Sequence, residues 1–216
     1  MIKHHPTDAL LFAFAEGSLS VTLSMAVSAH IELCECCQQK LTQLEQSLGE
    51  ESLGGEEEIL VDSAFAAMFD DITADDTFAQ TVDTVAETIM YQRKEIILPR
   101  ALSCIERTEF LNLGKIGRSR YTVEDGTLRA SLLHIGAGGE IPNHTHTGFE
   151  VTLLLDGDFG DEDGDYVPGD FIMLDGRHTH TPKTKEGCLC FTVVSAQLHF
   201  NKGLSKLLNP IGNLIY

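Results

Sequence analysis

Residues 138–157 read GGEIPNHTHTGFEVTLLLDG, and this stretch decides how the C-terminal half of the chain folds. Successive side chains of an extended strand point to opposite faces, so His144, His146 and Glu150 are predicted to share one face. The run 151–155 predicts a strand that is buried on both faces. A carboxylate and two imidazoles are costly to bury together unless a cation lies among them, so a divalent metal site is predicted here. The alternative is a hairpin with surface histidines.

The spacing G-x5-H-x-H-x3-E-x6-G, from Gly138 to Gly157, resembles the first motif of the cupin superfamily. That resemblance implies a small antiparallel β-barrel with a metal bound on these residue types. The segment 165–174, DYVPGDFIML, resembles the second cupin motif, which ends in another histidine. His178 and His180 both follow it, and alternation does not separate them because their parity is the same. Enzyme-type cupins have this histidine closer to the Pro-x-Gly turn, with an asparagine after it, and this sequence has neither.

Short apolar stretches separated by turn signals fill the chain from about residue 96 to residue 200. Pairs such as Asp156-Gly157 and Pro168-Gly169 mark the turns. Many short strands with regular turns are typical of a β-barrel or sandwich. The predicted strands are 121–123, 128–135, 150–155, 171–174 and 188–200.

The first part of the chain has helical periodicity instead. Helices are predicted at 9–17, from Ser20 to about Cys37, and at about 38–48. The second of these contains the motif His30-x3-Cys34-x2-Cys37. At about 100° per residue, positions i, i+4 and i+7 lie within about 40° of one another on a helix surface. These three side chains are therefore predicted to share one face of a single helix.

One imidazole and two thiolates supply three of the four ligands of a tetrahedral zinc site. His4 or His5, one helix upstream, can supply the fourth, and the spacing does not choose between them. Cys36, at i+6, projects from a different side of the helix. The alternative is that the cysteines pack as small hydrophobic residues. Because a helical domain of about 80 residues has a thin core, loss of zinc is expected to unfold or rearrange it.

Both motifs, in this order, resemble the zinc-binding anti-sigma factors of the ChrR type over nearly the whole chain. The resemblance implies an α + β protein of two domains. A small helical zinc bundle at 1–85 would sequester an ECF-type sigma factor. A cupin-like antiparallel β-barrel at 96–200 would sense oxidative stress, such as singlet oxygen or an organic hydroperoxide. Residues 201–216 form a C-terminal tail. The alternative is a dioxygenase-like cupin enzyme with an accessory helical domain.

The same resemblance implies the metal ligands. In that family the upstream zinc ligand is the histidine just before the first helix, and the last barrel ligand precedes a Thr-Pro pair. The implied zinc ligands of the helical domain are His5, His30, Cys34 and Cys37. The implied ligands of the barrel are His144, His146, Glu150 and His180. Zinc or another divalent transition metal would suit the barrel, since three imidazoles and a carboxylate select no single metal.

The chain has 15 Lys and Arg residues against 33 Asp and Glu residues, a formal net charge of −18. This charge argues against direct binding to nucleic acid or to an anionic membrane, because both favour a basic surface. It fits a basic protein partner. No leader opens the chain, and the apolar run 9–15 is too short to span a bilayer. A cytoplasmic location is therefore expected.

The segment 49–76 contains many carboxylates and no lysine or arginine. Gly54-Gly55 indicates an acidic linker within about 49–58. Residues 59–69 predict an amphipathic helix with an acidic flank, suited to a partner's groove or to packing on its own domain. Residues 78–91 show a weaker helical pattern.

The six cysteines do not resemble a secreted disulfide framework. Cys188 and Cys190 share a face of the last predicted strand. Their separation along an extended chain is about 6.4–6.8 Å, at the upper limit for a disulfide. They either pack as small residues inside the barrel or form a redox pair whose closure would buckle the strand.

Overall fold

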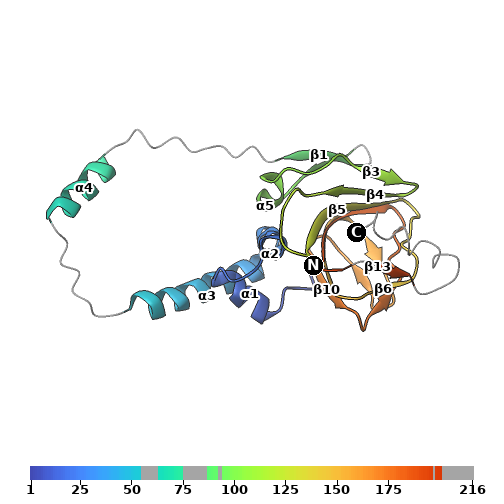
Figure 1. The fold of residues 1–216 in the computed structure, drawn as a ribbon, viewed down its shortest axis with the longest axis horizontal. Coiled ribbons are helices and arrows are strands. Elements are labelled where there is room, and N and C mark those ends of the chain that lie inside the picture. The colour runs from blue at the N-terminus through green and yellow to red at the C-terminus, as the bar shows by residue number, and fades with distance from the viewer. Residues whose placement is uncertain (55–62, 75–86, 92–93, 197, 201–216) are drawn as a thin grey trace.

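The computed structural model describes residues 1–54, 63–74, 87–91, 94–196 and 198–200, and it has an α + β fold in two parts (Figure 1). Helices α1 (Asp8–Ala15), α2 (Val21–Leu33), α3 (Glu35–Leu53) and α4 (Ser63–Ala74) precede the strands. The predicted fold class is confirmed. The linker residues 55–58 and the tail 201–216 lie outside the described residues. No described helix is long and apolar enough to cross a bilayer.

The second part consists of antiparallel strands. A six-stranded sheet has the order β10-β7-β12-β5-β4-β3. Its strands are β10 (Phe171–Asp175), β7 (Phe149–Gly157), β12 (Gly187–Val194), β5 (Arg129–Gly136), β4 (Ile116–Arg120) and β3 (Leu111–Leu113). A second sheet contains β11 (Thr179–His180), β6 (His144–His146) and β13 (Leu198–Phe200). The strands curve around an interior, as in a cupin-like barrel (Figure 1).

Two short pairs and one helix complete this part. Strand β8 (Phe159–Gly160) pairs with β9 (Asp165–Tyr166), and β1 (Thr88–Tyr91) pairs with β2 (Lys94–Ile97). The short helix α5 (Arg100–Ser103) follows β2. The hydroxyl of Tyr91 donates to the carbonyl oxygens of Ile135 and Cys188, which attaches the β1–β2 pair to the large sheet.

Every residue of β12 is buried, because both faces of this strand are covered. On one face, Cys188 and Cys190 pack inside the barrel with Leu154 and Ile172. On the other face, Phe191 and its neighbours belong to a cluster outside the barrel. The predicted apolar run of the last strand is explained by this two-sided burial.

The outer face of the large sheet carries the N-terminal helices. Helix α2 contacts β12, β7 and α5. A continuous cluster of buried side chains joins Leu11 and Val27 of the helices to Leu98, Leu153 and Phe191. The helical part and the barrel therefore share a hydrophobic core.

Four sequence predictions need correction. Residues 88–91 form strand β1 and not the end of a helix, because their side chains alternate between exposed and buried in the pair with β2; residues 78–86 lie outside the described residues. Helix α3 continues through Gly49 to Leu53 and ends at Gly54, whose N–H donates to the carbonyl oxygen of Glu50. The segment 121–123 forms no strand, and the predicted strand 188–200 is divided into β12 and β13.

The sequence analysis did not predict strands β3 and β4, because the alternation of apolar and polar residues in them is weak.

The N-terminus of α2 is capped from the barrel. A carboxylate oxygen of Asp125 accepts hydrogen bonds from the backbone N–H of Thr22 at 2.8 Å and from its hydroxyl at 2.6 Å. Burial would raise the pKa of Asp125, but these hydrogen bonds outweigh it and lower the pKa below its ordinary value. A carboxylate from the barrel thus satisfies a free N–H group of the helix.

Replacing this cap is expected to weaken the packing of the helices on the barrel. Asp125→Ala should lower the free energy of unfolding by about 0.5–2 kcal/mol, the usual cost of losing an N-cap carboxylate. Denaturant unfolding followed by circular dichroism measures the change. Glu124→Ala, at the preceding exposed position, is the matched control and should change stability little. Equal effects of the two substitutions would contradict the capping role.

Candidate metal centres

The helical cluster consists of His5, His30, Cys34 and Cys37, whose nitrogen and sulfur atoms all lie within 4.8 Å of one another. The Nε2 atom of His30 is 3.3 Å from the sulfur of Cys37. The Nδ1 atom of His5 is 3.4 Å from each of the two sulfurs. A tetrahedral zinc, with bonds of about 2.3 Å to sulfur and about 2.0–2.1 Å to nitrogen, places such donors roughly 3.5 Å apart.

The prediction that His30, Cys34 and Cys37 share one face of a single helix is wrong. Helix α2 ends at Leu33, and Cys34 has an extended backbone, with φ −128° and ψ 100°. It serves as the N-cap of α3, which contains Cys37. The reason is length, because residues i and i+7 are about 10.5 Å apart along a helix axis, too far for one ion to bridge. The break at Cys34 brings Cys37 back to His30.

The structure places His5, and not His4, in the helical cluster. The ring of His4 instead packs against Tyr166, with 5.1 Å between the ring centroids. Cys36 is exposed and lies outside the cluster. The spacing in the sequence could not choose between His4 and His5 as the ligand, because the two residues are adjacent in an extended segment.

The hydrogen bonds of His30 favour a cation at this cluster. Its Nδ1 is 2.8 Å from the carbonyl oxygen of Gly169, which can only accept, so Nδ1 carries the proton. The lone pair of Nε2 then faces Cys37. Burial lowers the pKa of His30 to about 4, so it stays neutral. Burial, and then Cys34, raise the pKa of Cys37 to about 12. A zinc ion would deprotonate the thiols and satisfy all four donors.

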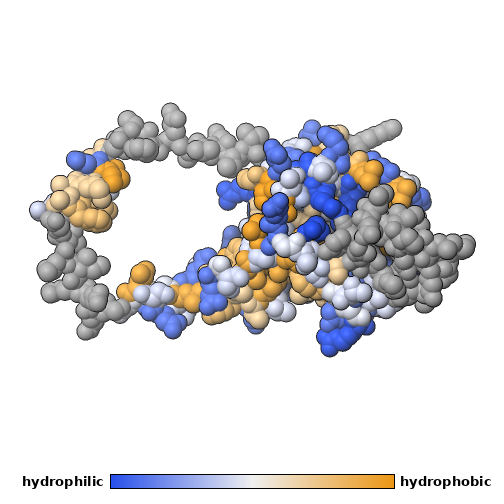
Figure 2. All heavy atoms as spheres, in the orientation of Figure 1, coloured by the Kyte–Doolittle hydropathy of each residue, from blue (hydrophilic) through white to orange (hydrophobic). Residues whose placement is uncertain are grey.

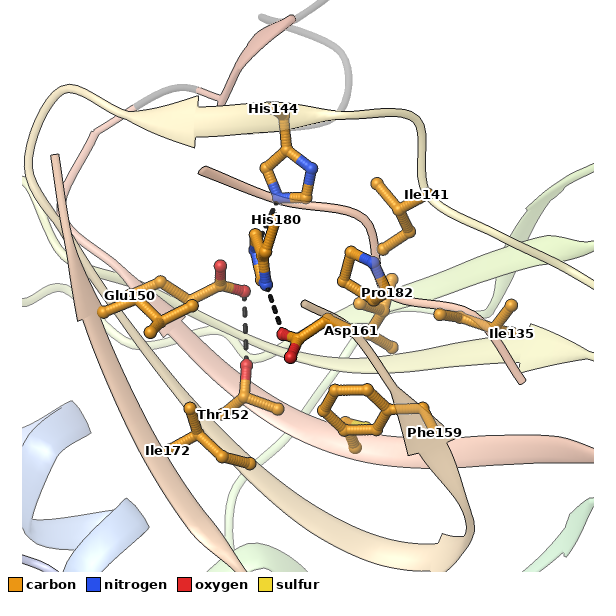
Figure 3. Close-up of a pocket in the computed structure, with 13 residues that line it drawn as sticks. Ile135, Ile141, His144, Glu150, Thr152, Phe159, Asp161, Ile172, His180 and Pro182 are labelled. Atoms are coloured by element: carbon orange, nitrogen blue, oxygen red, sulfur yellow. Dashed lines mark hydrogen bonds and ion pairs between the residues drawn. The ribbon is translucent and has the colours of Figure 1, made fainter. Parts of the chain in front are cut away.

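The cupin cluster consists of His144, His146, Glu150 and His180, which also lie within 4.8 Å of one another. The Nε2 atom of His180 is 3.0 Å from Nε2 of His144 and 3.5 Å from Nε2 of His146. Nε2 of His146 is 2.7 Å from a carboxylate oxygen of Glu150. Figure 3 shows His144, His180 and Glu150 converging above the apolar side chains of the barrel.

The prediction that these residues share one face of a continuous strand is also wrong. His144 and His146 lie on β6, whereas Glu150 lies on β7 in the other sheet. The chain turns at Gly148, where an added Cβ would lie 2.1 Å from the hydroxyl oxygen of Ser195. Six residues of extended strand span about 20 Å, so only a turn can bring His144 and Glu150 to one ion.

The lone pairs of the histidines at this cluster also favour a bound cation. Nδ1 of His144 donates to the carbonyl oxygen of Pro142 at 2.9 Å. Nδ1 of His180 donates to the carboxylate of Asp161 at 3.0 Å. Both Nε2 atoms therefore carry lone pairs that face each other at 3.0 Å. Burial lowers the pKa of His144 to about 4, which disfavours a proton between them. The residues fit a divalent metal with nitrogen and oxygen ligands.

Glu150 is ionised within this cluster. Burial opposes its charge, but the hydrogen bond and charge of His146, together with His144 and His180, lower its pKa to about 2. A buried carboxylate among three imidazoles supplies the negative charge that a divalent ion requires.

The structure separates the two histidines that the sequence left open. His180 lies in the cluster, whereas His178 is exposed and pairs with Asp175 at 2.9 Å. Sequence reasoning missed Asp161, which binds the outer nitrogen of His180. Its only signal was its place in an acidic loop, which usually indicates a solvated surface.

Cys188 and Cys190 pack inside the barrel as small buried residues. A hydrogen bond that the Cys190 thiol donates to Cys188, together with burial, raises the pKa of Cys190 well above its ordinary value. The thiolate, which is the reactive form, is therefore disfavoured at this position. Cys190 also lines the small cavity beside the cupin cluster.

Substitution of single cysteines tests the helical cluster. Cys34→Ser should remove about one equivalent of zinc per chain and destabilise the helices, because one thiolate ligand is lost. Cys36→Ser, two residues away and exposed, should keep its zinc. Elemental analysis of both purified variants beside the original protein measures this. Equal zinc content in the two variants would contradict the cluster.

Both the sequence and the fold of this chain are similar to those of known proteins. Residues 102–197 match the family model described as the ChrR cupin-like domain. The chain is 32% identical over 216 residues to the anti-sigma-E factor ChrR of Cereibacter sphaeroides, covering 97% of each chain. It also resembles the crystal structure of Rhodobacter sphaeroides SigE in complex with the anti-sigma ChrR, with a TM-score of 0.66, 28% identity, and coverage of 90% of this chain and 99% of that one. Since the identity extends over nearly the full length of both chains, this chain belongs to the ChrR family.

Proposed function

We propose that this protein is a cytoplasmic anti-sigma factor that sequesters an ECF-type sigma factor through its helical zinc domain, residues 1–85. The observation that carries the proposal is the 32% identity to the anti-sigma-E factor ChrR across both domains. The likeness to ChrR in a complex with SigE supports the same class of partner. Release of the sigma factor would then restore transcription of its genes.

Helix α4 offers the surface that such a partner would bury. None of its residues is buried by the described part of the chain. Phe65, Met68, Phe69 and Ile72 are 59, 49, 61 and 61% exposed. These positions are i, i+3, i+4 and i+7, so they form one apolar stripe. Figure 2 shows this helix as an apolar surface away from the rest of the molecule.

The charge of α4 and of the whole chain suits a basic partner. Asp70 and Asp71 lie beside the apolar stripe, and the formal net charge is −18. A sigma factor binds DNA and must carry basic surfaces to do so. An acidic helix with an apolar stripe can bind such a surface and compete with DNA for it.

The helical zinc would hold this domain in its binding form. Within the described residues, Cys37 is the one buried residue of α3. Leu41 and Leu44 are only partly buried against the core. Because α3 buries so little surface, zinc on His5, His30, Cys34 and Cys37 would fix it to α1 and α2.

We propose that the barrel, residues 96–200, senses oxidative stress, such as singlet oxygen or an organic hydroperoxide, at its metal cluster. The cavity beside the cluster has a volume of about 30 Å³. That volume holds about two water molecules, so a small oxidant could lie beside the cluster. The described residues offer no observation that favours the dioxygenase-like enzyme.

Binding to a purified ECF-type sigma factor tests the α4 surface. Phe65→Ser combined with Phe69→Ser should weaken the complex at least about tenfold, because two exposed aromatic anchors are lost. Zinc content should not change. Leu111→Ser combined with Leu113→Ser removes two exposed apolar side chains of β3 and is the matched control. Isothermal titration calorimetry measures both, and equal weakening would contradict the role of α4.

The site of oxidation tests the sensing role. After the purified complex is treated with an organic hydroperoxide, mass spectrometry should find the first modifications within residues 96–200 when the sigma factor dissociates. Cys34 and Cys37 should remain unmodified at that point, because their thiolates would be held by zinc. Oxidation of these two cysteines before any change in the barrel would contradict sensing by the cupin cluster.

A further inference from the structure

The chain segment that carries His5 is fixed to the barrel. Asp170 is fully buried, and one of its carboxylate oxygens accepts hydrogen bonds from the backbone N–H of Lys3 at 2.6 Å and of His4 at 3.0 Å. Its other oxygen accepts from the N–H of Val167 at 2.9 Å. The N–H of Phe171 donates to the carbonyl oxygen of His4 at 3.0 Å. The barrel turn 167–171 therefore sets the position of His5.

The same turn orients a second member of the helical cluster. The carbonyl oxygen of Gly169 accepts from Nδ1 of His30 at 2.8 Å. Gly169 has a φ of 94°, and an added Cβ would lie 2.4 Å from the side chain of Ile2. Only glycine fits here, so the turn and the N-terminal segment are closely packed.

Tyr166, just before this turn, reaches the cupin cluster. Its hydroxyl donates to a carboxylate oxygen of Asp161 at 3.1 Å. The other oxygen of Asp161 accepts a hydrogen bond from Nδ1 of His180 at 3.0 Å (Figure 3). The side chain of Asp161 is only 1% exposed. The ring of Tyr166 packs on His4, the residue before His5. A continuous path thus runs from His180 through Asp161 and Tyr166 to the segment that carries His5.

We propose that Asp161 and Tyr166 are positioning residues that couple the cupin cluster to the helical cluster. A metal bound to Nε2 of His180 fixes that ring, which fixes the carboxylate of Asp161 and, through it, the hydroxyl of Tyr166. Tyr166 then holds His4 and the backbone of His5 in place. Loss or exchange of the barrel metal would release Asp161 and Tyr166 from these fixed positions, and the residues of the helical cluster would then be held less firmly. The coupling is reciprocal, as linkage requires. This inference rests on the proposed metal binding at both clusters.

A double-mutant cycle in the full-length protein tests the coupling. Both clusters are loaded with cobalt(II), and the thiolate-to-cobalt charge-transfer absorption reports the helical cluster alone, because the cupin set contains no sulfur. A chelator is added and the decay of this absorption is timed. His144→Ala, which empties the cupin cluster, should speed the decay at least about fivefold, the lower end of typical coupling between sites.

Tyr166→Phe should abolish the extra effect of His144→Ala, so that the two substitutions are not additive. His4→Ala interrupts the path at an exposed position and should do the same. Tyr121→Phe is the matched control, because this buried hydroxyl donates to the carbonyl of Leu102 and contacts neither cluster. With Tyr121→Phe, His144→Ala should keep its full effect.

The same acceleration by His144→Ala in all backgrounds, or no acceleration in any, would overturn the coupling while leaving the proposed function intact. If the original protein never develops the charge-transfer absorption, the helical metal site fails and both proposals are overturned. Coupling lost in Tyr166→Phe and in His4→Ala, but kept in Tyr121→Phe, is the expected result.

Discussion

The constraint on which the rest of this structure depends is that four side chains must place their donor atoms within 4.8 Å at each cluster. A single helix or strand cannot bring the ligand atoms this close at the sequence spacings of the two motifs. A helix separates Cys37 from His30 by about 10.5 Å along its axis, and a strand separates Glu150 from His144 by about 20 Å. The regular structure is interrupted once within each motif, at Cys34 and at Gly148. These two interruptions set the relative orientation of the helices and strands on either side.

The break at Cys34 determines how the helices meet the barrel. It ends α2 after its apolar face has covered the outer side of β7 and β12. It also begins α3, in which Cys37 is buried and Leu41 and Leu44 pack against the edge of the core. Asp125 caps α2 from the barrel, and Asp170 fixes the segment before α1. The helical part is thus attached to the barrel by a shared core and by two buried or half-buried carboxylates.

Much of this was predictable from sequence, because ligand types and spacings are local properties of the chain. The residues of the two clusters, helix α4 and the strands β5, β7 and β10 follow from them. The choice between His4 and His5 depends on the contact of His4 with Tyr166, which is distant in sequence. The choice between His178 and His180 depends on the pairing of His178 with Asp175, which no sequence pattern indicates. The single-helix and single-strand predictions failed because periodicity describes direction around an axis and ignores distance along it.

Helix α4 differs from the other helices in what stabilises it. A helix of 12 residues is marginal in water on its own, and most helices in proteins are stabilised by packing an apolar face. The face of α4 contains Phe65 and Phe69, and the described part of the chain does not bury it. The apolar surface that would stabilise this helix must therefore be supplied from elsewhere. Under the proposed function, the sigma factor would supply this surface and bind α4, while the barrel continues to hold α1 and α2.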